Sequence, residues 1–346
     1  MTRSYLGVDA GNSKTVALVG DSDGKVLGWG RAGVGDIYGA PDEPTAVGNV
    51  FAAVDAALER AGAAGHRPDS ATFCLAGVDW PEDGEFWQER IAQRYPGLTR
   101  FSVRNDGFAT LRAGAPSGLG IAVSVGTGPA VAARGPDGTQ RCLGWWCFDH
   151  LGGDGLGAAG LRAVYRSHQG LAPATTLTGH LTRLYQIDSV AELLHAFTRR
   201  ADPLPRALQG RAARIVLACA AGGDPVANRI VDEQAVAFAG YAWWVGREAG
   251  FDTDREQVPV ILGGSVVTSE IPALRDQLAR RIAERIPGAQ TTTARLPPAV
   301  GALLEAMAED PMTGDAPRSA AGEDTLSQVR ARLADGDVPL DLFTTD

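Results

Sequence analysis

The feature that most constrains the fold is an internal repeat. Residues 119–146, LGIAVSVGTGPAVAARGPDGTQRCLGWW, follow the same plan as residues 6–30, LGVDAGNSKTVALVGDSDGKVLGWG. Each copy has an apolar run, a glycine loop, a second apolar run, an Asp-Gly turn and a closing Leu-Gly-Trp. This order predicts a strand, loop, strand, turn, strand meander in both halves. Unrelated hairpins could share this pattern, but a divergent duplication explains it better. Duplication predicts two similar halves that face one cleft.

Helix and strand patterns alternate along each half and predict an α/β fold. In the first half, a helix with one buried face is predicted over residues 45–61, a strand at 71–75, a helix near 82–94 and a strand at 101–103. In the second half, helices are predicted around 204–221, 226–245, 272–286 and 299–308, with a strand at 258–262.

Size and composition favour two domains. The chain has 346 residues, and 45% of them are apolar, which is enough for two domains that each bury a core. We expect an N-terminal domain of residues 1–115 and a C-terminal domain of residues 116–312. Residues 313–346 are polar and rich in Gly, Asp, Ala and Ser, a composition that predicts a flexible tail.

Charge and hydropathy argue against several classes of partner. Lys and Arg number 32 against 41 Asp and Glu, and the formal charge of −9 opposes binding to nucleic acids and anionic membranes. No run approaches the roughly 20 apolar residues that span a bilayer. The N-terminus enters a strand-like run without a signal-peptide pattern. We therefore expect a cytoplasmic protein with neither a nucleic-acid nor a membrane partner.

Cysteines and histidines do not predict a metal centre. The four cysteines, Cys74, Cys142, Cys147 and Cys219, show no C-x-x-C spacing and are expected to be buried free thiols. The five histidines form no cluster with metal-ligand spacing. A G-x-G-x-x-G match at residues 155–160 lacks the preceding strand and the later acidic residue of a dinucleotide site. We expect no iron–sulfur cluster, no zinc and no dinucleotide.

The two glycine loops of the repeat have the chemistry of phosphate binding. A glycine turn brings several backbone N–H donors close to a phosphate chain without a crowding Cβ. The first loop runs from Asp9 to Thr15, and the second is Gly126-Thr127-Gly128. In the first loop, Asp9 can hold a hydrated Mg²⁺, while Ser13, Lys14 and Thr15 can donate to phosphates. Alone, each loop also fits an ordinary hairpin; as a duplicated pair, they favour phosphate binding.

Short motifs in a fixed order reveal a family resemblance. D-x-G-x-x-x-T is present at Asp9, Gly11 and Thr15, and S-x-G-T-G at Ser124, Gly126, Thr127 and Gly128. An apolar strand leads into Gly263-Gly264-Ser265, and P-x-x-GA occurs at residues 298–302. Over residues 4–308 the chain thus resembles the N-acetylglucosamine kinase and BadF-type ATPase family of the hexokinase, actin and heat-shock-protein superfamily. The resemblance implies duplicated ribonuclease-H-like domains of the actin/hexokinase type around a central cleft.

The resemblance also implies a function, an ATP-dependent kinase acting on N-acetylglucosamine or a related amino sugar with ATP and Mg²⁺. Asp106 lies where the family has its catalytic aspartate, although an aspartate there can also cap the following helix. Nucleotide and phosphate contacts are implied for Asp9, Gly11, Asn12, Ser13, Lys14, Thr15, Gly126, Thr127, Gly128, Gly263, Gly264 and Ser265, with Asp9 also at the metal. Substrate contacts are implied for Asp36, Gly77, Asn105, Asp106, Thr127 and Asp154. The expected partners are a small-molecule sugar and a second copy of the chain in a homodimer.

The sugar end departs from the family pattern. The family's LGDEGSG reads LGGDGLG at residues 151–157, so that Gly153-Asp154 replaces an acidic pair, and we expect the loss at Gly153 to enlarge the sugar pocket. A family asparagine is absent from the stretch at 35–38, where Asp36 is the candidate substitute. These changes predict better tolerance of a free-amine hexosamine. The alternative functions are an ATPase that activates a partner redox enzyme and a catalytically weak sugar sensor.

Overall fold

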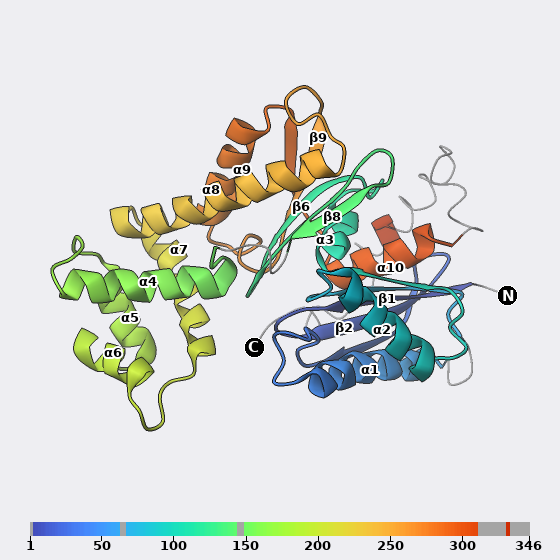
Figure 1. The fold of residues 1–346 in the computed structure, drawn as a ribbon, viewed down its shortest axis with the longest axis horizontal. Helices are drawn as coiled ribbons and strands as arrows, with labels where there is room; N and C mark the ends of the chain where they lie inside the picture. The colour runs from blue at the N-terminus through green and yellow to red at the C-terminus, as the bar shows by residue number, and fades with distance from the viewer. Residues whose placement is uncertain (1–2, 63–66, 144–148, 311–329, 333–346) are drawn as a thin grey trace.

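The computed structural model describes residues 3–62, 67–143, 149–310 and 330–332, which are organised around two five-stranded sheets (Figure 1). The first sheet contains β1 (Ser4–Ala10), β2 (Thr15–Asp21), β3 (Val26–Ala32), β4 (Ser70–Leu75) and β5 (Phe101–Asn105). Its strand order is β3-β2-β1-β4-β5. β1 to β3 form an antiparallel meander, while β4 runs parallel to β1 and β5 runs parallel to β4.

The second sheet repeats the plan of the first. It contains β6 (Gly120–Val125), β7 (Pro129–Arg134), β8 (Gln140–Leu143), β9 (Val258–Gly263) and β10 (Ala289–Thr293), in the order β10-β9-β6-β7-β8. β6 to β8 are antiparallel, whereas β9 and β10 run parallel to β6. Read from its other edge, this sheet has the order and directions of the first, which confirms the duplicated α/β plan. The closing Gly-Trp of the second repeat copy lies outside the described residues.

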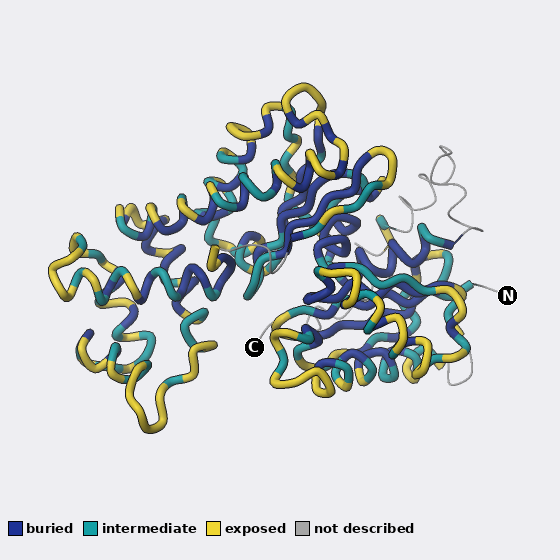
Figure 2. The backbone as a smooth tube through the Cα atoms, in the orientation of Figure 1, coloured by how far each residue is buried: buried dark blue, intermediate teal, exposed yellow. Residues whose placement is uncertain are grey.

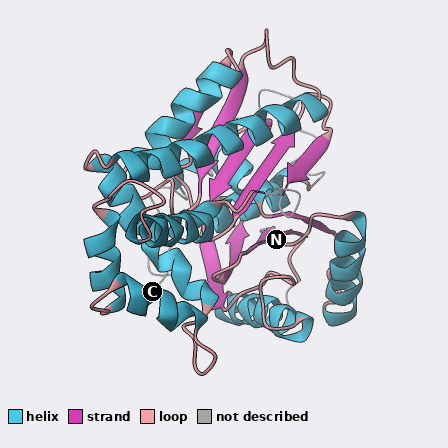
Figure 3. Cartoon of the chain, turned by 60° about the vertical axis from the view of Figure 1, so that its left-hand side comes forward, coloured by secondary structure: helices cyan, strands magenta, loops and turns pink. Residues whose placement is uncertain are grey.

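Helices cover the strands and form a lobe on the second half. The helices are α1 (Glu43–Arg60), α2 (Pro81–Arg94), α3 (Gly107–Gly114), α4 (Gly152–His168), α5 (Leu177–Tyr185), α6 (Val190–Thr198), the 3-10 helix η1 (Arg206–Ala212), α7 (Ala213–Ala221), α8 (Pro225–Glu248), α9 (Ala273–Arg285) and α10 (Pro298–Ala308). Figure 1 shows α4 to α7 at one end of the molecule, and Figure 3 shows helices lying outside the strands. Within the described residues, no helix combines the length and apolar character needed to cross a membrane.

One predicted helix is divided in the structure. The segment 204–221 contains η1 followed by α7 rather than a single helix. Gly210 lies so close to α4 that a Cβ there would be 2.3 Å from Oδ1 of Asp154. Because glycine also disfavours an α-helix interior by about 1 kcal/mol, the chain takes a tighter turn at this contact. Most of the predicted tail lies outside the described residues; within 330–332, Arg330 donates to the carbonyl oxygen of Arg112.

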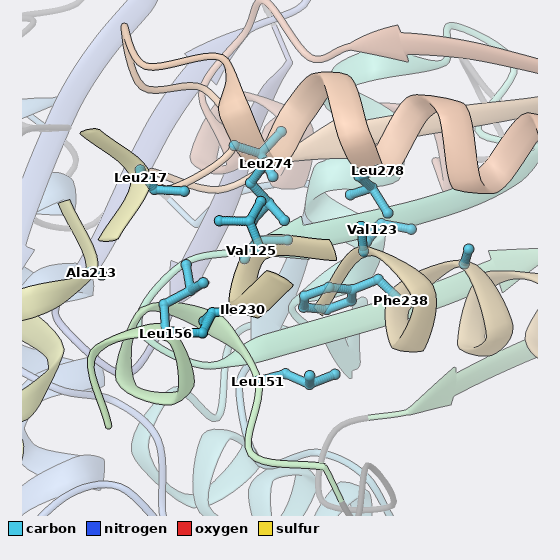
Figure 4. Close-up of a cluster of buried hydrophobic side chains, with 14 of the residues drawn as sticks. Val123, Val125, Leu151, Leu156, Ala213, Leu217, Ile230, Phe238, Leu274 and Leu278 are labelled. Carbon is cyan, nitrogen blue, oxygen red and sulfur yellow. The ribbon is translucent and has the colours of Figure 1, made fainter. Parts of the chain in front are cut away.

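Each half buries a hydrophobic core, drawn as the dark blue interior in Figure 2. In the first half, Val8 of β1 packs in one cluster with Trp87 of α2. In the second half, Val123 of β6 packs in one cluster with Phe238 of α8 and Leu274 of α9, as Figure 4 shows. The apolar residues whose spacing predicts these helices therefore form the helix faces that pack against each sheet.

Backbone contacts of α3 and α10 connect the two halves. A Cβ on Gly7 of β1 would lie 2.1 Å from the backbone nitrogen of Leu303, so α10 rests directly on the first sheet. A Cβ on Gly301 of α10 would lie 2.0 Å from the carbonyl oxygen of Ala109 in α3. Side chains of α3 pack in turn on β6, β7 and β9 of the second sheet. These two helices therefore fix where the sheets stand relative to each other.

A buried ion triad reinforces this connection. Glu305 of α10 accepts hydrogen bonds from Nε of Arg112 at 3.1 Å and from Nη1 of Arg134 at 2.7 Å. Burial by itself would raise the pKa of Glu305, but the two guanidinium groups lower it to about 2. Because Arg112 lies in α3 and Arg134 in β7, the triad joins α10 to both helix and second sheet.

The glycine contact generates a stability prediction. We expect Gly301→Ala to lower the free energy of unfolding by about 1–3 kcal/mol, the usual effect of overpacking a tight contact. Gly48 of α1 is a matched control, since a Cβ there meets nothing within 4 Å, and Gly48→Ala is expected to stabilise the helix by up to about 1 kcal/mol. Urea unfolding measures both changes. Equal stability of the two variants would contradict the α3–α10 contact.

Candidate active site

A cavity of about 930 Å³ lies between the two sheets and takes its walls from both halves. Much of its lining follows directly on the carboxyl ends of β1, β4, β5, β6 and β9. This edge is where open α/β sheets bind ligands, because the connecting loops leave a crevice there. Every site residue predicted from the sequence lines the cavity except Thr15.

The loop between β1 and β2 forms one wall. The backbone N–H of Gly11 donates to the carbonyl oxygen of Lys14 at 2.9 Å and closes the turn. Asp9, Asn12 and Ser13 line the cavity around that turn.

Thr15 corrects the predicted set of phosphate ligands. Its side chain is fully buried, and its hydroxyl donates to the carbonyl oxygen of Gly33 at 2.9 Å. The hydroxyl therefore ties the loop to the end of β3 instead of facing the cavity. The sequence motif identifies the loop correctly, but it does not show which way this first residue of β2 points.

The loop between β6 and β7 forms the facing wall. The N–H of Gly126 donates to the carbonyl oxygen of Gly128 at 3.1 Å. The hydroxyl oxygens of Ser13 and Thr127, which are 114 residues apart in the chain, are 2.7 Å apart and share a hydrogen bond. The two glycine loops of the repeat thus meet across the cleft, as expected for two halves that hold one ligand between them.

The N-terminus of α4 supports the second loop. Gly153 and Asp154 donate their backbone N–H groups to the carbonyl oxygens of Gly126 and Thr127, at 2.8 and 3.1 Å. A Cβ on Gly153 would point toward the oxygen of Gly126 at 3.3 Å, and Gly153 is not part of the cavity lining. The expectation that glycine at this position enlarges the sugar pocket is therefore wrong. Asp154 does line the cavity, and burial raises the pKa of its carboxyl group.

Asp106 is directed into the cavity because its neighbour caps the helix. α3 begins at Gly107, whose N–H donates at 2.9 Å to Oδ1 of Asn105, while the Asp106 side chain makes no capping hydrogen bond. The amide of Asn105 also donates to Oδ1 of Asp79 at 2.9 Å. The capping role that a sequence allows for Asp106 is thus taken by Asn105, and the Asp106 carboxyl group is available to a ligand.

Four carboxyl groups meet at this end of the cavity: Asp9, Asp36, Asp79 and Asp106. Burial raises the pKa of Asp106 well above its usual range, and the nearby Asp9, Asp79 and Asp36 raise it further. Burial also raises the pKa of Asp36, and it raises that of Asp9 to about 7 against the opposing attraction of Lys14. Such a cluster favours ligands that bring positive charge or hydrogen-bond donors.

The turn after β9 forms another part of the cavity lining. Gly264 has a φ of +84°, and a Cβ there would lie 2.5 Å from the backbone of Val125, so only glycine fits between β9 and β6. Gly263 and Ser265 lie beside it in the lining. The segment that leads into α10 also lines the cavity, through Ala294, Arg295, Leu296, Pro297 and Pro298.

Sequence reasoning missed several lining residues. Asp79, Tyr38, His150 and Arg295 belong to no short motif, although all line the cavity. Asp79 had a usable signal, because it follows shortly after the buried strand β4 and ligands gather beyond the ends of parallel strands. Tyr38 comes from the connection between β3 and α1, and its position depends on tertiary contacts alone.

The residues present fit a magnesium ion that is held mainly by phosphate oxygens. Mg²⁺ prefers oxygen ligands and usually takes only one or two carboxylates in phosphoryl-transfer sites. Asp9 offers such an oxygen beside the first loop, where desolvation outweighs the attraction of Lys14 and raises its pKa to about 7. Among the described residues, no group of three or more His, Cys, Asp or Glu side chains is arranged to hold a metal.

The chain has two ribonuclease-H-like halves, and each contributes a loop to one cleft. This arrangement is that of an actin-like or hexokinase-type protein with the sugar-kinase fold. The chain belongs to the BadF/BadG/BcrA/BcrD ATPase family, whose model matches residues 6–306. Both the predicted resemblance and the predicted fold are thereby confirmed. No curated protein matches the sequence.

Solved structures with this fold include sugar kinases. A candidate N-acetylglucosamine kinase from Chromobacterium violaceum superposes with a TM-score of 0.65 at 26% identity, covering 87% of this chain and 98% of that one. A second candidate N-acetylglucosamine kinase, from Porphyromonas gingivalis, gives 0.62 at 17% identity, covering 87% and 97%. A ROK family glucokinase from Streptomyces griseus, solved with glucose and AMPPNP, gives 0.53 at 21% identity, covering 88% and 99%.

The raised pKa of Asp9 generates a prediction for the ligand-free protein. Because the pKa rises from 3.8 to about 7 on folding, the folded state binds more protons between these values, and stability falls as pH rises through this window. Asp9→Asn removes the penalty of an ionised, partly buried carboxylate. We expect it to raise Tm more at pH 8 than at pH 5 and to change Tm little near pH 3.5, measured by thermal melting without magnesium.

Asp137 provides the control of opposite sign. It lies in an exposed turn, where the backbone and hydroxyl of Thr139 hold its pKa below the usual range. Its ionised form therefore stabilises the fold above that pKa, and Asp137→Asn is not expected to raise Tm at pH 8. If Asp9→Asn fails to raise Tm at pH 8, partial burial of Asp9 does not destabilise the fold at that pH.

Proposed function

We propose that this protein is an ATP-dependent kinase that phosphorylates a hexosamine, N-acetylglucosamine or a related amino sugar, with Asp106 as its general base. One observation carries the proposal: Asp106 shares a single cavity with two facing loops of phosphate-binding chemistry. The family membership and the likeness to the Chromobacterium violaceum protein support ATP use and a sugar substrate.

In this proposal the Asp106 carboxylate accepts the proton of the attacking sugar hydroxyl. The group must be ionised to do so, although its pKa is raised in the ligand-free cleft. Positive charge that arrives with the substrates lowers this pKa again. The fixed cap of Asn105 on α3 holds the neighbouring carboxylate in place while the hydroxyl attacks in line.

The remaining predicted residues bind the nucleotide in this proposal. Backbone N–H groups of both loops and the ammonium group of Lys14 bind the phosphates, and Gly263 to Ser265 border the adenosine. When bound, Mg²⁺ beside Asp9 would neutralise charge on the transferring phosphoryl group. Closure of the cleft keeps water away from the phosphoryl group, so that the sugar hydroxyl accepts it.

The activator function is the weaker alternative. Cys74, Cys142 and Cys219 are free and come from β4, β8 and α7, and no observation within the described residues favours a cluster shared between subunits. Cys147 lies outside the described residues. Stoichiometric iron after anaerobic purification would support an activator instead of a kinase. A homodimer and a cytoplasmic location stay predictions.

The first test of the proposal changes the general base. Asp106→Asn is expected to lower kcat at least about a hundredfold, the low end for losing a positioned proton acceptor, while nucleotide affinity changes little. Asp149→Asn is the control, because Asp149 lines the same cavity and accepts from the Tyr241 hydroxyl at 2.8 Å, a bond that asparagine can keep. Steady-state kinetics measure both. Turnover of Asp106→Asn equal to that of the control would remove Asp106 from the mechanism.

The second test concerns the sugar. Asp36 is 5% exposed, and its Oδ1 accepts from the N–H of Tyr38 at 2.9 Å, a bond that asparagine can also accept. Its carboxylate offers a charge-assisted hydrogen bond to a protonated amine, worth about 1.5–3 kcal/mol. Asp36→Asn is therefore expected to lower the kcat/KM ratio of glucosamine to N-acetylglucosamine. A ratio that stays within about twofold, or roughly 0.4 kcal/mol, would mean that Asp36 does not select the sugar.

A further inference from the structure

Two large aromatic side chains in and next to the cavity lining are exposed to solvent. Tyr38 lines the cavity and is 48% exposed, and Trp80, the neighbour of the lining residue Asp79, is 42% exposed. Large aromatic rings are usually buried, since their contact with water is unfavourable. Their exposure beside a polar cavity therefore marks a surface that a ligand can cover.

The Tyr38 ring has a fixed place before any ligand binds. A Cβ on Gly77 would lie 3.0 Å from Cδ2 of Tyr38, so the ring rests against the Gly77 backbone. The phenol donates a 2.7 Å hydrogen bond to Oδ1 of Asp83. This hydrogen bond is the main cause that raises the pKa of Tyr38 to about 12, so the phenol stays protonated at neutral pH.

Asp83 joins the ring to the carboxylate end of the cavity. It lies in the first turn of α2 and is 4% exposed. Its second oxygen, Oδ2, accepts from the N–H groups of Asp79 at 3.1 Å and Trp80 at 2.8 Å. Asp79 in turn accepts from Asn105, the residue before the proposed base. One buried carboxylate therefore sets the positions of both an aromatic and an acidic wall.

We propose that the Tyr38 ring is the surface on which the apolar face of the sugar packs, and that Asp83 is a positioning residue that holds this ring and Asp79 together. The inference rests on the proposed kinase function and assigns a specificity-determining contact to it. A pyranose ring presents C–H groups on one face and hydroxyls around its edge. An aromatic surface beside carboxylates matches both parts, because the ring buries the C–H face while the carboxylates accept from the hydroxyls.

Calorimetric titration of glucosamine, N-acetylglucosamine and AMPPNP tests the contact directly. Tyr38→Ala is expected to raise Kd for the sugars at least about tenfold and to leave Kd for AMPPNP within about twofold. Tyr38→Phe keeps the ring and is expected to keep sugar Kd within about threefold of wild type. Unchanged sugar affinity in Tyr38→Ala would overturn the inference.

Failure of the Tyr38 contact can be distinguished from failure of the proposed kinase function. A wild-type protein that neither binds nor phosphorylates any hexosamine would remove the kinase proposal, and this inference with it. A wild-type protein that phosphorylates a hexosamine, with Tyr38→Ala binding and turning it over equally well, would overturn only the role of Tyr38.

A double-mutant cycle tests Asp83. Asp83→Ala and Tyr38→Phe each remove the same phenol hydrogen bond, so their effects on sugar Kd are expected to be less than additive when combined. Tyr95→Phe is the matched control: Tyr95 follows the other end of α2 and donates to Asp55 at 2.8 Å. It is expected to leave sugar Kd unchanged. Additive effects in the cycle would show that Asp83 does not act through Tyr38. An equal loss of sugar affinity in Tyr95→Phe would show that the stability of α2 is responsible.

Discussion

Direct backbone contact between α3 and α10 fixes the position of the first sheet relative to the second. Because Gly301 has no side chain, α10 approaches the carbonyl oxygen of Ala109 and still rests on Gly7 of the first sheet. α3 meanwhile packs on the second sheet. Asp106 immediately precedes α3, so this contact also fixes the helix from which the candidate base extends. The buried triad around Glu305 holds it in place.

The electrostatics of the cleft follow from the same arrangement. Two parallel strand ends of the first sheet and the β1 turn bring several carboxyl groups into a partly dehydrated space. Their raised pKa values belong to the ligand-free protein, since positive charge from a metal or an amine lowers them. Binding and ionisation are therefore coupled: a ligand that carries positive charge prepares the carboxylates that receive it.

The fold and many of the residues that line the cavity could be predicted from the sequence because the relevant signals are local. The repeated meander and the glycine loops are contiguous, so their residues fix the turn chemistry within a few positions. Thr15 and Gly153 were misplaced because a motif names a residue without giving the direction of its side chain. Tyr38 and Asp83 escaped notice because a hydrogen bond across 45 residues leaves no local pattern.

The position of α10 also limits how the chain can be divided. Leu303 and Val300, from near the end of the described chain, share a buried cluster with Tyr5 and Val16 of the first sheet. A fragment that stops at the predicted boundary near residue 115 would lack this helix and expose the apolar surface that it covers. The first sheet is therefore not a module that can be excised alone, and in complementation its missing helix would have to come from the C-terminal fragment.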